Sequence, residues 1–271
     1  MRKQHHKIHW QETQRGEKAK MMKAIDIHTH CNCGRKGDVA ETELHKRGFD
    51  FFMEEYRNSG IICGGFSYYA GLFYPDEAYA CNEQLYEQAQ NDARVYQWLI
   101  LDPRVDILFG QIEKLITNEK VLGIKIHNHK LFHNYSMDEY ADKIFSFANE
   151  LGCNVMMHPD DNLKMMRYVD QYPNMNLILA HLSSVEHVEA MRRAKHGNIY
   201  TDTSGSMINR NDVVEYAVEQ LGSEKIFFGT DTYACGCQKG RIEYARISDR
   251  DKENILYNNA KRHFAKQFAK I

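Results

Sequence analysis

Short apolar runs alternate with longer amphipathic stretches from residue 22 to the end of the chain. Apolar runs of this length, rich in β-branched and aromatic residues, predict buried strands, whereas apolar residues three and four apart predict helices. The predicted strands are 22–28, 61–67, 95–101, 122–127, 153–158, 176–181, 198–203 and 226–230. The predicted helices include 77–92, 104–118, 136–151, 161–171, 184–195 and 211–221.

Strands that alternate with helices of this length favour parallel βαβ units, and eight such units close into a barrel. We therefore expect the α/β class and a single-domain (β/α)8 TIM barrel over residues 22–271, with a doubly wound open sheet as the alternative. No dinucleotide-binding fingerprint follows the first strand, because the glycines of CNCGRKG have the wrong spacing. Residues 1–21 are basic and lack periodicity, so we expect a disordered tail there.

Composition excludes several classes of partner. The formal net charge is −2, which gives no overall attraction to nucleic acid or to an anionic membrane. No apolar run approaches the roughly 18 residues of a membrane helix. Seven cysteines, an odd number in a chain of this length, indicate free thiols and hence a reducing cytoplasm. We expect a cytoplasmic protein that acts on a small molecule. The sequence allows a homo-oligomer.

Polar side chains gather where the predicted strands end. The first strand leads into MMKAIDIHTHCNCG, and on a regular strand Asp26, His28 and His30 would share one face. Later strands end in further ionisable residues: Lys125 and His127, His158, His181, and Asp231. The carboxyl ends of parallel barrel strands meet at one face. Four of these histidines (His28, His30, His158 and His181) and Asp231 form a ligand set there that is suited to zinc or another divalent ion.

The chain also resembles a known family over most of its length. The matching segments are IDIHTH (25–30), LDPR (101–104), GIKIH (123–127), MMHP (156–159), YPNMNLILAHLS (172–183), NIYTDTSG (198–205), FFGTD (227–231) and NILYNNAKRHF (254–264). In this order they resemble the amidohydrolase superfamily, in the branch that includes aminocarboxymuconate-semialdehyde decarboxylase and the amidohydrolase-related hydrolases.

The resemblance implies that His28, His30, His158 and Asp231 bind one catalytic divalent ion, with zinc as the expected metal. It further implies that His181 is an acid/base or a ligand of a second ion, and Asp231 is the other candidate for proton transfer. TatD-type nucleases place a glutamate on the fourth strand, where this chain has Lys125. A carboxylated lysine bridging two ions would need Lys125 at the metal, and we favour a position deeper in the barrel.

Such a site suits hydrolysis, because a divalent ion with one open position activates water. We expect a metal-dependent hydrolase of a small amide, lactone or ester, with a carboxylate on its substrate. The first alternative is a zinc-dependent, non-oxidative decarboxylase of a small unsaturated or aromatic carboxylate; the second is a metal-binding barrel without catalytic activity. Four residues on the expected face are candidates for substrate contact: Lys125, His127, Arg210 and Tyr68.

Two Cys-x-Cys pairs follow the first and last strands. Closure of a barrel makes these strands neighbours, so loops containing Cys31 and Cys33 and loops containing Cys235 and Cys237 should lie side by side. We expect packing roles for these cysteines, because Cys-x-Cys is not the usual zinc spacing. A second, softer ion or a redox-sensitive pair is the alternative.

Overall fold

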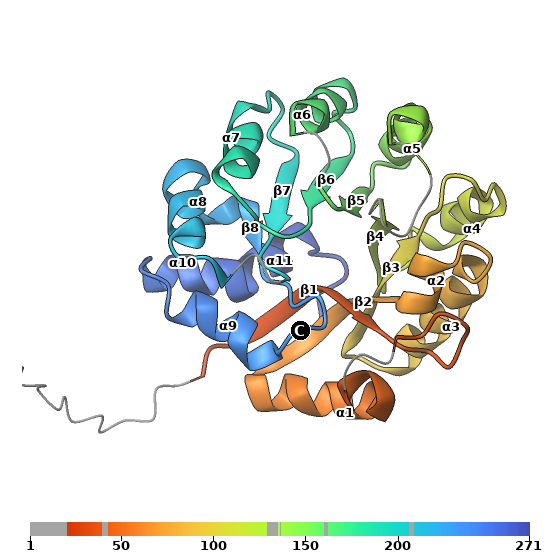
Figure 1. Ribbon diagram of the computed structural model, residues 1–271, viewed down its shortest axis with the longest axis horizontal. Coiled ribbons are helices and arrows are strands. Elements are labelled where there is room, and N and C mark those ends of the chain that lie inside the picture. Colours follow the sequence, from red (N-terminus) through yellow and green to blue (C-terminus); the bar gives the residue numbers. More distant parts are fainter. Residues whose placement is uncertain (1–20, 40–42, 129–134, 136, 160–161, 206–208) are drawn as a thin grey trace, which may run out of the picture.

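The buried apolar runs form eight strands that surround one axis (Figure 1). A computed structural model describes residues 21–39, 43–128, 135, 137–159, 162–205 and 209–271, so residues 1–20 of the predicted tail lie outside the described residues. The strands are β1 (Ala24–Cys31), β2 (Ile61–Tyr68), β3 (Val95–Ile100), β4 (Val121–Ile126), β5 (Asn154–Met157), β6 (Asn176–Leu179), β7 (Ile199–Asp202) and β8 (Ile226–Phe227). All eight predicted strands are confirmed.

The eight strands form one sheet. Its strands follow sequence order, and each pairs in parallel with the next. Backbone hydrogen bonds join β1 to the residues around the end of β8: Ile27 N–H donates to Phe228 O at 3.0 Å and Asp231 N–H to His28 O at 2.8 Å. The predicted (β/α)8 barrel, in one domain, is therefore confirmed.

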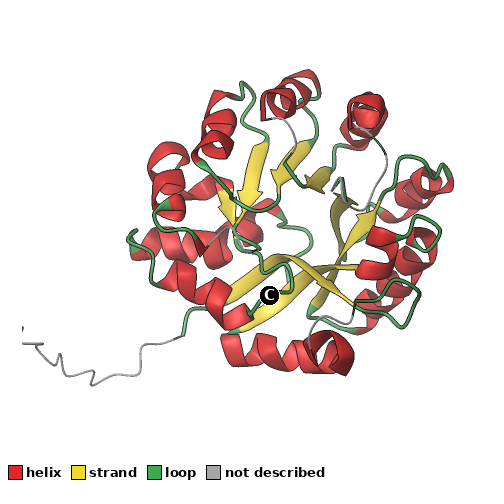
Figure 2. Ribbon diagram, viewed as in Figure 1, coloured by secondary structure: helices red, strands yellow, loops and turns green. Residues whose placement is uncertain are grey.

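Helices cover the outside of the barrel (Figure 2). They are α1 (Glu43–Ser59), α2 (Tyr69–Phe73), α3 (Ala78–Asn91), α4 (Ile107–Leu115), α5 (Met137–Leu151), α6 (Asn162–Gln171), α7 (Val185–Arg193), α8 (Val213–Leu221), η2 (Ser223–Lys225), α9 (Cys235–Glu243), α10 (Asp249–Glu253), η3 (Asn254–Asn258) and α11 (Asn259–His263). The six predicted helices correspond to α3 through α8. Among the described residues, no helix is long and apolar enough to cross a membrane.

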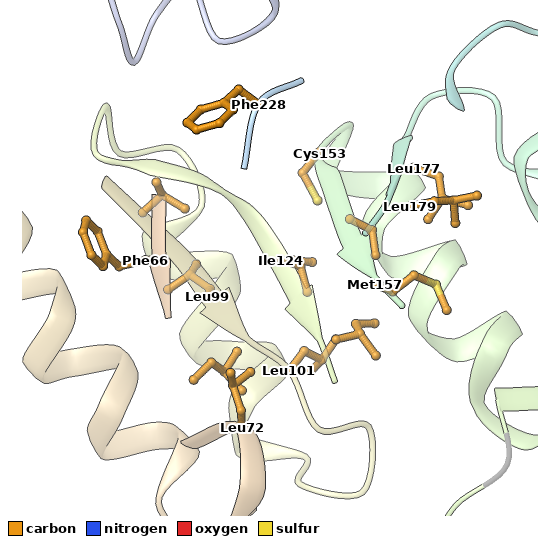
Figure 3. Close-up of a cluster of buried hydrophobic side chains, with 14 of the residues drawn as sticks. Phe66, Leu72, Leu99, Leu101, Ile124, Cys153, Met157, Leu177, Leu179 and Phe228 are labelled. Carbon is orange, nitrogen blue, oxygen red and sulfur yellow. The ribbon is translucent and has the colours of Figure 1, made fainter. Parts of the chain in front are cut away.

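Two apolar layers hold the barrel. The outer layer lies between strands and helices and includes Leu99, Ile124 and Leu179 from the strands and Leu72 from α2 (Figure 3). Burial of each such side chain contributes about 1.5–3 kcal/mol relative to exposure. These contacts explain why the short strands are predicted well from their apolar character alone.

The inner layer fills the barrel near the amino ends of the strands. The C-terminal segment contributes Phe264, 6.1 Å from the Trp98 ring, and Phe268, 4.6 Å from the Tyr96 ring. All four side chains belong to one buried cluster. This packing closes the amino end of the barrel, which leaves the carboxyl end of the strands for a site.

Strand β1 contains a bulge that decides where its polar side chains point. Asp26 pairs with Gly64 and Thr29 with Phe66, so three steps along β1 match two along β2. An extra residue interrupts the alternation of a strand. The prediction that Asp26 shares a face with His28 and His30 is therefore wrong: Asp26 Oδ2 accepts a hydrogen bond of 2.5 Å from Tyr56 of α1.

The Asp26 carboxylate ties the bulge to the end of β8. Its Oδ1 accepts the backbone N–H of His28 at 3.0 Å and that of Thr230 at 3.1 Å. Its Oδ2 accepts the Thr230 hydroxyl at 2.6 Å in addition to Tyr56. Asp26 is fully buried, so four donors replace its hydration shell.

We expect Tyr56→Phe to lower the free energy of unfolding by about 1–3 kcal/mol, because the ring stays and a buried carboxylate loses one donor. Urea denaturation measures the change. Tyr244→Phe is the matched control: Tyr244 is 79% exposed, and its hydroxyl should contribute less than about 0.5 kcal/mol. Equal stability of the two variants would show that the Tyr56 hydroxyl does not support the Asp26 network.

Candidate metal centre

Two imidazoles from β1 and a carboxylate from the loop after β8 converge at the carboxyl end of the barrel. His28 Nε2 and His30 Nε2 are 3.2 Å apart. Asp231 Oδ1 lies 3.1 Å from His30 Nε2 and 3.8 Å from His28 Nε2. The bulge in β1 makes this possible, because it turns both histidines toward the interior.

The other ring nitrogens are held by hydrogen bonds. His28 Nδ1 lies 2.8 Å from Asp202 Oδ2 at the end of β7, and His30 Nδ1 lies 2.8 Å from Ser67 Oγ on β2. A histidine that binds a metal through one nitrogen commonly has the other nitrogen fixed by a carboxylate or another polar group. Both Nε2 atoms are thereby directed at the same point.

The three groups fit a divalent ion in spacing. Tetrahedral ligands at zinc–nitrogen distances of 2.0–2.1 Å lie about 3.3 Å from each other. The His28–His30 and His30–Asp231 separations, 3.2 and 3.1 Å, are close to this value. His28, His30 and Asp231 form one of two groups among the described residues that could hold a metal; the other is His28, His181 and Asp202.

The protonation states also suit a cation. Burial lowers the pKa of His28 to about 3 and also lowers the pKa of His30, so both rings are neutral and offer a lone pair. Burial by itself would raise the pKa of Asp231, but the neighbouring His181 and a hydrogen bond from His30 hold it well below its usual range. The donor set is two neutral nitrogens and one carboxylate.

The chain matches the family described as amidohydrolase over residues 25–266. It belongs to the amidohydrolase family. A search of curated proteins found no match.

Solved structures share the fold at low sequence identity. A 2,6-dihydroxybenzoate decarboxylase from Rhizobium aligns with a TM-score of 0.72 and 16% identity, over 90% of this chain and 99% of that one. A dihydroxybenzoic acid decarboxylase from Polaromonas, solved with bound manganese and the inhibitor 2-nitroresorcinol, aligns at 0.68 and 17%, over 90% and 97%. A 4-oxalomesaconate hydratase from Rhodopseudomonas palustris aligns at 0.65 and 15%, over 91% and 97%.

His181 lies beside the convergence point of this amidohydrolase in an uncommon backbone conformation. Its φ is 63°, and the φ angles of Asp231 and Thr232 are 55° and 64°. Left-handed backbone at non-glycine residues costs about 1–3 kcal/mol and occurs often at functional sites. His181 Nε2 lies 3.7 Å from Asp231 Oδ2, and its Nδ1 lies 2.9 Å from Ser204 Oγ. The ring therefore faces the carboxylate.

Two residues that the sequence analysis did not assign hold this arrangement. A side chain at Gly205 would place its Cβ 2.8 Å from His181 Nδ1, so glycine leaves room for the ring. Thr232 Oγ1 donates to His30 O at 2.8 Å and accepts from His30 N–H at 3.1 Å. It also accepts from the Tyr69 hydroxyl at 2.9 Å. These contacts fasten the loop after β8 to β1.

Aromatic rings continue the site beyond the histidines. The Tyr69 ring is 5.4 Å from the His30 ring and stacks on Phe73 at 5.7 Å. Phe73 contacts His127 at 5.2 Å, and His127 contacts His158 at 4.9 Å. We call Tyr69, Phe73 and His127 the aromatic wall. It begins at the candidate metal ligands and runs along the mouth of the barrel.

The remaining predicted residues lie at different distances from the centre. His158 contacts the His181 ring at 5.0 Å but is in neither candidate metal group. Lys125 is fully buried, as expected, yet its Nζ reaches His28 Nε2 at 2.9 Å, and burial lowers its pKa to about 8. Arg210 is exposed and donates to Ser183 O at 3.1 Å.

Tyr68 does not join the site, contrary to the prediction. It is buried in the outer layer, where its hydroxyl donates to Gln88. Its neighbour Tyr69 occupies the position expected for Tyr68, because α2 begins there and changes the direction of the chain. Which tyrosine of the Tyr68–Tyr69 pair faces the site depends on where β2 ends, and the sequence alone does not give that residue.

Asp202 is the functional residue that the sequence analysis missed. It is fully buried at the end of β7, and besides His28 it accepts from the backbone N–H groups of Ser204 at 2.8 Å and His181 at 3.2 Å. Its position at a strand end, in the segment NIYTDTSG, was an available signal. Burial raises the pKa of Asp202. The hydrogen bond and charge interaction with His28 oppose this effect, so the pKa lies below the usual range.

The four cysteines of the two Cys-x-Cys pairs do not form a cluster. Cys235 and Cys237 are in α9 and not in a loop, and Cys235 is buried. Neither candidate metal group among the described residues includes a cysteine. The loop position predicted for Cys235 and Cys237 is wrong, because α9 begins at Cys235, directly after the β8 loop. The burial of Cys31 and Cys235 agrees with the expected packing role.

We expect Asp202→Asn to weaken metal binding about 10–100-fold, because an amide cannot hold His28 in the same tautomer with the same charge. Calorimetric titration of the metal-free protein with Zn²⁺ and with Mn²⁺ measures this. Asp212→Asn is the control, since Asp212 is exposed and pairs with Arg246. Equal affinities in the two variants would exclude the orienting role of Asp202.

Proposed function

We propose that this amidohydrolase is a metal-dependent, non-oxidative decarboxylase of a small aromatic carboxylate. The observation that carries the proposal is the aromatic wall, in which Tyr69 lies next to His30 and Phe73 stacks on Tyr69. Aromatic side chains favour stacked or edge contacts with a planar ring. The structural neighbours that act on dihydroxybenzoates support the same substrate class. This favours the alternative of the sequence analysis over hydrolysis.

The proposed ligands are His28, His30 and Asp231. His158, whose ring lies 5.0 Å from that of His181, is proposed as the fourth from the family resemblance. Zinc suits this nitrogen-rich set, and manganese is the second candidate because a related structure contains it. When bound, the ion would supply positive charge that holds and orients the substrate carboxylate. The chain itself must then bind the ring, exclude water and deliver a proton.

Loss of CO₂ from an aromatic carboxylate leaves an electron pair on the ring carbon, which a proton must take up. We assign this proton to Nε2 of His181 in its protonated form. Asp231 Oδ2, 3.7 Å away, stabilises the positive ring, and Ser204, 2.9 Å from Nδ1, fixes its orientation. The C–C bond to the carboxylate breaks, its electrons stay on the ring carbon, and the proton from Nε2 forms the new C–H bond.

Two cations flank the proposed path of the substrate. Lys125 adds positive charge beneath His28, and Arg210 lies at the mouth next to the loop after β6. His127, within the aromatic wall, contributes a face or an N–H to the ring substituents. A carboxylate that enters past Arg210 would approach Lys125 and, when it is bound, the ion, which would orient the substrate with its ring against the aromatic wall.

The first test is a substrate panel with protein loaded with Zn²⁺ or Mn²⁺. We expect CO₂ release from a hydroxylated benzoate such as 2,6-dihydroxybenzoate, because the site offers a flat wall and a proton donor. Lactones, amides and esters with a carboxylate complete the panel. Hydrolysis of one of these without any decarboxylation would replace this proposal with the hydrolase. Full metal occupancy with no turnover would favour a metal-binding barrel without activity.

The second test separates the roles of two neighbouring histidines. His181→Asn should reduce kcat about 10²–10⁴-fold with metal content near one ion per chain, because it removes a proton donor. His158→Ala should instead remove most of the metal. His196→Asn, at an exposed histidine, is the control. The metal content and kcat of each variant are measured. Full metal occupancy in His158→Ala would show that His158 is not a metal ligand.

A further inference from the structure

Two thiols lie in contact next to the mouth of the barrel, outside the site described above. Cys33 is in the loop after β1 and Cys81 is in the first turns of α3, and their Sγ atoms are 3.9 Å apart. The two residues are 48 positions apart in the sequence, so the fold and not the local chain brings them together. A disulfide needs an S–S distance of about 2.05 Å, so the two Sγ atoms must come closer before a bond forms.

The loop is bound to α3 at Cys33 and just after it. Gln84 Nε2 donates to Cys33 O at 3.0 Å, and Arg35 pairs with Glu77, next to the start of α3, at 2.9 Å. Asp38 accepts the backbone N–H of Cys33 at 3.1 Å and so gives the loop a compact turn. The sulfur atoms are therefore held near each other, which raises the rate of any reaction between them.

The two thiols differ in exposure and in character. Cys33 is partly exposed, whereas Cys81 is only 1% exposed. A hydrogen bond from the Cys33 thiol, opposed by burial and aided by Arg35, lowers the pKa of Cys81. Cys81 also lies near the N-terminus of a 14-residue helix, which favours a thiolate. An external reagent reaches Cys33 first, and Cys81 is the thiol placed to react with the product.

We propose that Cys33 and Cys81 form a reversible redox site, in which Cys33 reacts with a disulfide or peroxide oxidant and Cys81 closes an intramolecular disulfide. The hydrogen bond to Cys81 and burial raise the pKa of Cys33, so Cys33 reacts as its proton passes to the Cys81 sulfur. With glutathione disulfide, Cys33 Sγ attacks one sulfur, forms a mixed disulfide and releases one glutathione thiolate, which takes up the proton from Cys81. The Cys81 thiolate then attacks Cys33 Sγ, forms the Cys33–Cys81 bond and releases the second glutathione. The two protein thiols lose two electrons and two protons, and the oxidant takes both up.

This site has a structural consequence for the candidate metal centre. Cys33 is three residues after His30, and Cys81 belongs to the helix that follows α2, which supplies Tyr69 and Phe73. A disulfide would join the loop leaving the metal ligands to the element behind the aromatic wall. The oxidised protein therefore has this side of the mouth cross-linked, whatever reaction the centre catalyses.

The test uses Cys237→Ser as the background, because Cys237 is the exposed thiol and would react by itself. The folded protein is incubated with glutathione disulfide, alkylated, and analysed by intact mass and by peptide mapping. We expect a loss of two hydrogen atoms, no retained glutathione, and a Cys33–Cys81 cross-linked peptide. Dithiothreitol should restore both thiols.

Two further variants in this background show the order of the steps. Cys81→Ser should keep one glutathione on Cys33, and Cys33→Ser should react far more slowly, because Cys81 is buried. Glutathione retained on Cys33 with Cys81 present, a cross-link to Cys31 instead, or no loss of thiols would overturn the proposal. These measurements are made in the Cys237→Ser background and need no catalytic activity, so they are independent of the proposed function.

Discussion

The closure of the barrel between β1 and the end of β8 depends on one buried carboxylate, Asp26. It binds the backbone of His28 on one side and the backbone and hydroxyl of Thr230 on the other. A buried carboxylate without donors would be destabilised by several kcal/mol, so the donors must meet it in one geometry. That geometry includes the bulge that turns His28 and His30 inward, and it places Asp231 next to them. The candidate metal centre is therefore a direct consequence of how the sheet closes.

Several charged groups lie close together in the site. In a low-dielectric interior each of them would be destabilised without a partner. Asp202, Asp231 and Lys125 all lie at the buried histidines, and each carboxylate has an imidazole within hydrogen-bonding or ion-pair distance. Burial keeps the histidines neutral, which preserves their lone pairs for a cation. Left-handed backbone at His181, Asp231 and Thr232 adds local strain, which the hydrogen bonds of Thr232 and Ser204 offset. The same contacts thus position the donors and stabilise the fold.

Family membership and the proposed reaction are supported by different observations. Membership of the amidohydrolase family follows from a match over nearly the whole chain, whereas the solved structures named above are 15–17% identical and establish the fold. One barrel and one metal site can support hydrolysis, hydration and decarboxylation. What differs between these reactions is the surface beside the metal, and here that surface is formed by the rings of Tyr69, Phe73 and His127.

The sequence by itself determined the eight strands, the barrel and the placement of His28, His30, His181 and Asp231 at one end of it, because apolar periodicity and strand order are properties of the local chain. The direction of a side chain at a bulge or at the last residue of a strand is not such a property. Strand register decides it, and register depends on partners far away in the sequence. Only the tertiary structure therefore decided that Asp26 faces Tyr56, that Tyr69 and not Tyr68 reaches the site, and that Asp202 orients His28. For the same reason, only the fold could pair Cys33 with Cys81 across 48 positions of the sequence.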